Sequence, residues 1–518
     1  SSHFGSKACS KGGPQGMFWV VFFVVLAVVV GELLGLKPCA ILGLTLTWCA
    51  QRTPQFLACF WVRFGGFVTT VVYTLAQRRC HPNGNPKQKW LDFYQIHCAA
   101  HFEVNGACQI TTVASLEPPP SLAAVAAAAR QLQRHHPLLR AAFRRGSGAS
   151  LKTPCCDPVF MDCSCGPDMK VLEHTCPIDE AVEMEQLAPL DPEVLGWRLA
   201  LCGKHLILTY HHSFLDGLSV MAILEDVLAL LDGQDFGGCS VEDKMLPPPR
   251  DDLPWYMPWV VLPCAADLAA LCVQSAPAWL KPLATGVPWQ DRRMKQVWRT
   301  LPSEITSHLL QRCRMEQTTM SGALAAAACH AMAEVLDASS SLRCRVQVNI
   351  RPDCQRHRRT LGCYVGSFRV ALDPGMPLWE LARAHRADLT CCRRERRHLI
   401  LALMQPYPFH LQLSCGEKSH PHPGDHPGIG NDLGISNRGA FCLATKSHCV
   451  TAVHWVREHR GDADSDFLLI NACSVNGVLC LTLCYKDPIV DQGLIAAITD
   501  KLMHKLVSAA GVDGAAAL

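Results

Sequence analysis

The chain has 518 residues, of which 49% are hydrophobic and 18% are charged, and its formal net charge at pH 7 is +3. This globular composition excludes a disordered chain. The small net charge gives no indication of a nucleic-acid partner, which would require a basic face. The length exceeds one ordinary hydrophobic core, so we expect the chain to divide into two domains or lobes.

The 29 cysteines are spread along the whole chain. Their odd number and irregular spacing do not fit a disulfide framework, so we interpret most of them as buried apolar residues in a reducing compartment. One cluster could ligate zinc, but it lacks paired Cys-x-x-Cys spacing, and we expect no metal site. The cluster comprises Cys155, Cys156, Cys163, Cys165, His174 and Cys176.

The N-terminal part of the chain predicts a membrane region. Residues 1–16 are small and polar and are expected to be disordered, and Met17 is a candidate natural start. Residues 18–36 form an almost unbroken apolar run, the length of a membrane-spanning helix. A signal peptide is the competing interpretation, but no small-residue cleavage site follows. Residues 56–76 are a weaker second candidate, so residues 17–79 hold one or two apolar helices.

The charges after these segments predict an orientation. Arg78, Arg79, Lys87 and Lys89 follow the apolar region, and positive residues favour the cytosolic side of a membrane. We therefore expect a protein of the endoplasmic reticulum or another endomembrane, with the downstream domain facing the cytosol. Unpaired cysteines agree with this placement.

Helical and strand patterns alternate through the rest of the chain. An alanine-rich helix is predicted at 121–136, ended by Pro137, and a strand-like run follows. Residues 246–258 are rich in proline and have the composition of a crossover. Further helices are predicted at 217–231 and 321–335, a strand pair at 197–210, and strands at 344–350, 365–372, 467–473 and 478–485. These patterns place a first lobe at 90–245, a linker at 246–290 and a second lobe at 291–515.

The strongest local signal is the sequence HHSFLDG, from His211 to Gly217, between a predicted strand and a predicted helix. Such a junction can project a side chain into a cleft, and a glycine there permits close approach. The imidazole of His212 can take a proton near neutral pH, and Asp216 can fix the loop. The alternative is that both histidines are structural and that Asp216 only caps the helix.

This motif resembles the active-site motif of the chloramphenicol acetyltransferase and condensation-domain superfamily. The resemblance covers about residues 90–510 and is closest to alcohol O-acetyltransferases, with wax ester synthase and diacylglycerol acyltransferase relatives nearby. Four further stretches agree in order: RHHPLLR at 134–140, NIRP at 349–352, LGCYVG at 361–366 and ISNRG at 435–439. The segment 475–485 is similar to the closing strand pair of these proteins.

The resemblance implies roles for individual residues. His212 would be the general base, and Asp216 would be structural, held by an ion pair with Arg351 from the other lobe. His211 and Gly217 would shape the loop around the base.

Two more residues, Ser436 and Asn437, would line the cleft or polarise the thioester oxygen. The sequence departs from the superfamily at two positions: Cys363 replaces a usual asparagine, and Arg438 replaces a small or apolar residue. These departures leave the substrate preference open.

The implied fold is α/β, with two chloramphenicol acetyltransferase-like lobes around a central cleft and an N-terminal transmembrane region. The implied activity is O-acyl transfer from acyl-CoA, as co-substrate, to an alcohol or lipid acceptor, with no cofactor and no metal. The oligomeric state is not predicted. Three alternatives remain: condensation with a carrier-protein donor, a non-catalytic lipid-binding or scaffold relative at the membrane, and a small-molecule receptor with a zinc-bound cysteine cluster.

Overall fold

The computed structural model describes residues 85–91, 95, 98–99, 108–146, 159–164, 166–234, 245–246, 292–399, 431–457 and 466–512. The chain divides into two compact units, and all described residues belong to the unit formed by Cys80–Pro406 and Gln412–Leu518. The expected disordered segment at 1–16, the membrane region at 17–79 and the linker after Leu246 lie outside the described residues. Among the described helices, none alone is long and apolar enough to cross a membrane, although the bent pair of α12 (Ser303–Met315) and α13 (Met320–Leu336) passes that test on length and composition.

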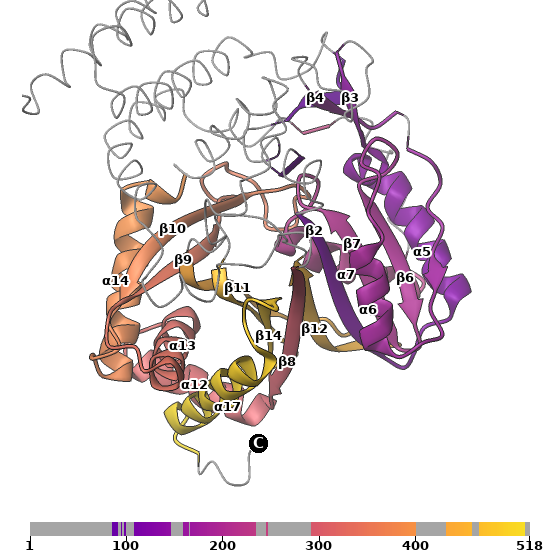
Figure 1. The fold of residues 1–518 in the computed structure, drawn as a ribbon. Helices are drawn as coiled ribbons and strands as arrows, with labels where there is room; N and C mark the ends of the chain where they lie inside the picture. The colour runs from indigo at the N-terminus through magenta and orange to yellow at the C-terminus, as the bar shows by residue number, and fades with distance from the viewer. Residues whose placement is uncertain are drawn as a thin grey trace, which may run out of the picture. The chain divides into compact units, whose positions relative to one another are not determined.

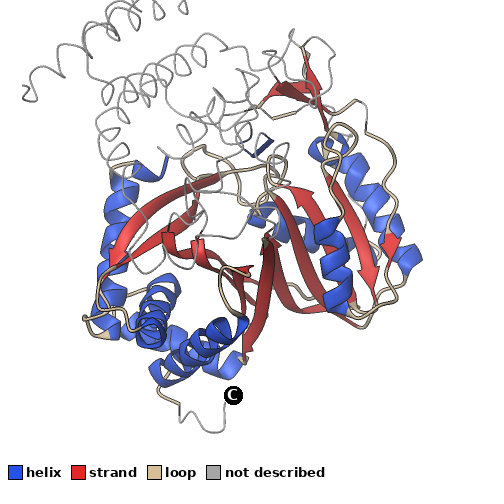
Figure 2. Cartoon of the chain, viewed as in Figure 1, coloured by secondary structure: helices blue, strands red, loops and turns tan. Residues whose placement is uncertain are grey.

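The first half of the unit is built on a five-stranded sheet in the order β12-β2-β7-β6-β5 (Figures 1 and 2). β6 and β7 form an antiparallel hairpin whose turn contains Gly203 at φ +56°, a conformation that suits glycine. The strands are β2 (Gln109–Glu117), β5 (Leu172–Glu173), β6 (Trp197–Cys202), β7 (His205–His211) and β12 (Cys449–Arg457).

Both faces of this sheet are covered. Along β7, Leu206 and Leu208 pack in one core with the helices α5 and α7, whereas Ile207 points to the other face, where α6 packs. This alternation follows the two-residue period of a strand, and it buries β7 on both sides. The helices are α5 (Leu122–His135), α6 (Ile178–Leu187) and α7 (Gly217–Leu231).

A small sheet in the order β1-β4-β3 accompanies the first half. The strand-like run expected after Pro137 is a short 3-10 helix, η2, at Pro137–Arg140, followed by β3 at Ala142–Arg145. Proline at the first position favours this helical turn because its φ is already helical. The other two strands are β1 (Gln88–Trp90) and β4 (Val159–Asp162).

The second half carries a six-stranded mixed sheet in the order β10-β9-β11-β13-β14-β8. Its helices pack on one face over a single apolar core (Figure 1). The strands are β8 (Arg293–Leu301), β9 (Leu342–Asn349), β10 (Val365–Leu372), β11 (Asn431–Phe441), β13 (Asp466–Val475) and β14 (Val478–Asp487). The helices are α12 (Ser303–Met315), α13 (Met320–Leu336), α14 (Leu378–Arg394) and α17 (Gln492–Ala509).

The expected mixed α/β fold is confirmed, but the expected boundary at residue 291 does not separate the two sheets. β12 lies in the second half of the sequence and pairs antiparallel with β2 of the first. Cys473 and Cys480 likewise pack into the core of the first half. A local pattern of hydrophobic residues cannot reveal this exchange, because the partner strand is more than 300 residues away in sequence.

Candidate functional site

The loop between β7 and α7 is held firmly by backbone hydrogen bonds. The amide of His212 donates to the carbonyl of Cys108 at 2.8 Å, and the amide of Asp216 donates to the carbonyl of Gly362 at 3.1 Å. The hydroxyl of Ser213 donates to the backbone of Gln95 at 2.6 Å. The loop is thus fixed from both halves of the chain, so the imidazole of His212 has a defined position.

The imidazole of His212 is held in one tautomer. Its Nδ1 lies 2.9 Å from the carbonyl oxygen of Leu215. A carbonyl can only accept, so Nδ1 carries the hydrogen and Nε2 carries the lone pair. The Sγ of Cys363 lies 3.7 Å from the same Nδ1, so the residue that departs from the superfamily pattern touches this side of the ring. Nε2 is therefore the basic nitrogen.

The imidazole of His212 is neutral at physiological pH. Burial, and after it the nearby cation of Arg457, lower the pKa of His212 to about 4. The Leu215 carbonyl and the carboxylate of Asp216 act in the opposite direction. A neutral imidazole is the form that accepts a proton.

His211 has a different environment and a structural position. Its Nδ1 accepts from the amide of Ser213 at 3.1 Å, and its ring packs edge-on against Phe143 and Phe214. Burial lowers the pKa of His211 to about 3. These contacts hold the loop against the hydrophobic core.

Arg351 and Asp216 form a two-point ion pair between the two halves of the chain. Nη1 of Arg351 lies 2.7 Å from Oδ2 of Asp216 and Nη2 lies 2.9 Å from Oδ1. The carboxylate also accepts from the Ser219 amide as the N-cap of α7 and from the Tyr364 amide. Both side chains are almost fully buried. Burial raises the pKa of Asp216, but Arg351 and these hydrogen bonds outweigh it and hold the pKa below its usual value.

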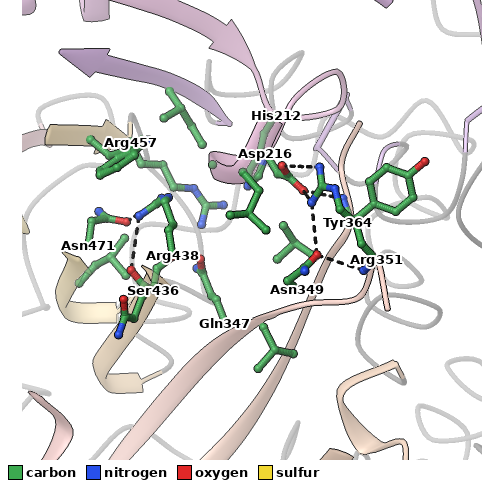
Figure 3. A pocket seen from close by; sticks show the side chains of 18 residues that line it. His212, Asp216, Gln347, Asn349, Arg351, Tyr364, Ser436, Arg438, Arg457 and Asn471 are labelled. Carbon is green, nitrogen blue, oxygen red and sulfur yellow. Dashed lines mark hydrogen bonds and ion pairs between the residues drawn. The ribbon is translucent and has the colours of Figure 1, made fainter. Parts of the chain in front are cut away.

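A cavity of about 190 Å³ opens beside His212. Figure 3 shows the Asp216–Arg351 pair on one side and Arg438 with Asn471 on the other. Both halves of the chain line it: Ile110, His212, Asp216, Gly217 and Leu218 from the first, and Gln347, Val348, Asn349, Arg351, Tyr364, Val365, Ser436, Asn437, Arg438, Trp455, Arg457, Leu469 and Asn471 from the second.

The segment Ser436–Arg438 enters the cavity at an irregularity of β11. The register of β11 against β13 shifts between Asn437 and Ala440, and such bulges redirect side chains beside functional sites. The side-chain Nδ2 of Asn437 donates to the Ser321 hydroxyl at 3.1 Å, and its Oδ1 accepts from the backbone amide of Gly439. Asn437 is thus engaged in holding the bulge, whereas Ser436 presents a buried side chain to the cavity.

Two arginines in the cavity, Arg438 and Arg457, are absent from the site residues expected from sequence. Arg438 was recognised there only as a departure from the superfamily pattern. Arg457 lies on β12, and no motif marks it. Only the pairing of β12 with β2 brings it beside the loop.

The cysteine–histidine cluster that was considered as a zinc site, and not expected to be one, is only partly described. His174 lies 2.8 Å from Glu185 and thus has a protein partner. Within the described ranges, no group of three histidine, cysteine or acidic side chains is arranged to hold a metal ion. The described cysteines form no disulfide with one another.

No protein-family model matches the sequence, and no curated protein is similar to it. Solved structures with the same fold are nevertheless found. A trichothecene 15-O-acetyltransferase from Fusarium sporotrichioides is 11% identical with a TM-score of 0.59, covering 82% of this chain and 95% of its own. The condensation domain of Monacolin K polyketide synthase is 14% identical with a TM-score of 0.58, covering 82% and 98%.

The first condensation domain of the calcium-dependent antibiotic synthetase is also 14% identical, with a TM-score of 0.58, and covers 84% of this chain and 98% of its own. Each of these structures covers more than four fifths of this chain. At such low identity, the similarity shows that the chain shares their fold.

Proposed function

We propose that this chain, which has the fold of the chloramphenicol acetyltransferase and condensation-domain superfamily, transfers an acyl group from a thioester to a hydroxyl acceptor. The observation that carries the proposal is the hydrogen bonding and protonation of the His212 imidazole. Its Nδ1 is committed to the Leu215 carbonyl, so a neutral Nε2 serves as the base in a cavity lined by both halves of the chain. The likeness to an O-acetyltransferase and to condensation domains supports the reaction class.

The reaction requires one base and no covalent intermediate on the protein. Nε2 of His212 takes the proton of the acceptor hydroxyl as its oxygen attacks the thioester carbonyl carbon. The carbonyl electrons move to the oxygen, giving a tetrahedral oxyanion that hydrogen-bond donors stabilise. Its collapse breaks the carbon–sulfur bond, and the imidazolium returns the proton to the thiolate. The products are an ester and a free thiol.

Four residues position the imidazole of His212 in this proposal and do not react themselves: Asp216, Arg351, His211 and Gly217. The ion pair fixes the start of α7 across the two halves, and the loop then presents the base at one place. Ser436 is the hydroxyl on β11 that lies in the same cavity and is a candidate donor to the oxyanion.

The donor that we propose is acyl-CoA, which needs no cofactor or metal, and the acceptor is an alcohol or lipid, as in alcohol O-acetyltransferases. A membrane location facing the cytosol remains part of the proposal and rests on the sequence of residues 17–79 and the basic residues after it. A second candidate is condensation with a carrier-protein donor, which the likeness to condensation domains favours.

The experiment measures thiol release by the full chain from acyl-CoAs ranging from acetyl to palmitoyl, with a mixture of alcohols and diacylglycerol. Acceptor-dependent release, with ester formed in equal amount, supports the CoA-dependent reaction and gives the preferred acyl length. Transfer only from an acyl phosphopantetheinyl carrier protein supports the second candidate. No transfer from either donor contradicts both.

A further inference from the structure

Arg438 extends along the first turn of α7, next to the base. A Cβ placed on Gly217 would lie 2.0 Å from Nε of Arg438. The guanidinium carbon lies 4.0 Å from the ring centroid of Trp455, in the range of a cation–π contact. Nη2 donates to Oδ1 of Asn471 at 3.1 Å, and Nη1 donates to the carbonyl of Ser436 at 3.4 Å. The group is therefore held in one place.

The hydrogen-bonding capacity of Arg438 is not exhausted by these contacts. A guanidinium has five N–H donors, and the two hydrogen bonds above engage one on each Nη, both with neutral acceptors. Among the described residues, no carboxylate forms an ion pair with Arg438. Asp216, the one acidic residue lining the cavity among those described, is already bound by Arg351 at both oxygens.

Arg438 therefore contributes a positive charge that no carboxylate among the described residues offsets. The Asp216–Arg351 pair is neutral as a unit, and the imidazole of His212 is uncharged. A cation taken from water is costly unless a counter-charge is supplied. An anionic group of the substrate would supply that charge.

We propose that Arg438 binds an anionic group carried by the acceptor, either a carboxylate or a phosphate, so that the substrates are hydroxy acids or alcohol phosphates in preference to neutral alcohols. This inference rests on the proposed acyl transfer and names its acceptor class. The planar guanidinium presents paired N–H groups that match the oxygens of either anion. The acceptor is then held at two points, its hydroxyl at Nε2 of His212 and its anion at Arg438.

An anion bound at Arg438 would also raise the proton affinity of His212. In addition to burial, the cations of Arg457 and Arg438 lower the pKa of His212, because positive charge opposes formation of the imidazolium. A bound anion offsets this effect while the acceptor hydroxyl is in place. Proton transfer is thereby favoured when the acceptor occupies the cavity.

The test compares acceptors that differ only in the anion: 4-hydroxybutyrate with 4-hydroxybutyramide, 3-hydroxybenzoate with 3-hydroxybenzamide, and glycerol 3-phosphate with glycerol. Each is assayed with the acyl-CoA that the wild type uses best. We compare wild type, Arg438→Met, Arg438→Lys, and Arg299→Met as a matched control on an exposed arginine of β8. Thermal unfolding verifies that each variant is folded.

The expected result is a preference of about 100-fold in kcat/KM for at least one anionic acceptor over its neutral partner, because a site built for a polar group rejects the analogue lacking it. Arg438→Met should erase this preference mainly through KM, Arg438→Lys should retain part of it, and Arg299→Met should retain all of it. The carboxylate and phosphate pairs distinguish the two anions.

Three results distinguish a failure of the inference about Arg438 from a failure of the proposed acyl transfer. If the wild type transfers the acyl group to neutral acceptors with a kcat/KM equal to or higher than that for the anionic partners, the role of Arg438 is wrong, but the proposed acyl transfer stands. An equal loss of kcat with every acceptor in folded Arg438→Met overturns it in favour of stabilising the oxyanion. The absence of transfer to all alcohols in the wild type contradicts the proposed function itself.

Discussion

Arg351 contacts both carboxylate oxygens of Asp216 from the opposite half of the chain, at 2.7 and 2.9 Å, with both side chains almost fully buried. The pair therefore connects the N-terminus of α7 to the segment after β9. It fixes the loop that carries His212. Its removal should affect stability first and the rate through the position of His212.

Asp216→Asn should reduce the free energy of unfolding by about 3–5 kcal/mol, because it leaves the guanidinium of Arg351 buried without its counter-charge. Urea unfolding measures the loss. The double variant Asp216→Asn/Arg351→Met removes both charges and should recover part of the stability. A single variant as stable as the wild type would show that the pair contributes nothing.

The same pair predicts a loss of stability in acid. The pKa of Asp216 in the folded protein lies below the 3.8 of an unperturbed aspartate. The folded state therefore binds fewer protons, so the contribution is fully present above the unfolded pKa and is lost as pH falls through the folded pKa. Urea unfolding between pH 7 and pH 3 should show a smaller decline for Asp216→Asn than for the wild type. Parallel declines would contradict this.

The value of kcat/KM should not change with pH near neutrality. Burial, and after it the cation of Arg457, lower the pKa of His212 to about 4. In the proposed reaction the neutral ring is the base, so kcat/KM should be level from about pH 5 to 8 and fall only below that. Arg457→Met should move the acid limb upward, because it removes a positive charge near the imidazole. An acid limb near 6.5 in the wild type would contradict the buried, neutral base.

Gly217→Ala should displace Arg438 without removing it. The new Cβ would lie 2.0 Å from Nε of Arg438, while alanine itself favours the helix. We expect a folded protein whose kcat/KM is lower by about 10- to 100-fold, since small misplacements of site groups have effects of this size. Gly375→Ala, in the turn before α14, is the matched control. Wild-type activity in Gly217→Ala would show that Arg438 can move freely.

The local elements of the site could be predicted from sequence. The helix expected at 217–231 is α7, with the same bounds. The strand pair expected at 197–210 is β6 and β7, joined at the expected turn. In these segments the hydrophobic period and the turn residues agree with the tertiary structure. The contact between Arg351 and Asp216 was expected only from the resemblance, because 135 positions separate the two residues.

The charge of the cavity could not be predicted in this way. Arg457 reaches the cavity because β12 joins the sheet of the first half, and Arg438 enters it at the bulge of β11. Both depend on pairing between distant strands, for which hydrophobic periodicity carries no signal. A departure from the superfamily pattern was the one sequence signal that marked Arg438.

The most direct test of the central claim is the rate of acceptor-dependent thiol release by His212→Ala, beside the wild type and His211→Ala. Folded His212→Ala should lose about 10²–10⁴-fold in kcat, the usual contribution of a general base. His211→Ala, which removes core packing, should lose stability in addition to rate. A folded His212→Ala variant that keeps most of the wild-type rate would contradict the assignment of Nε2 as the base.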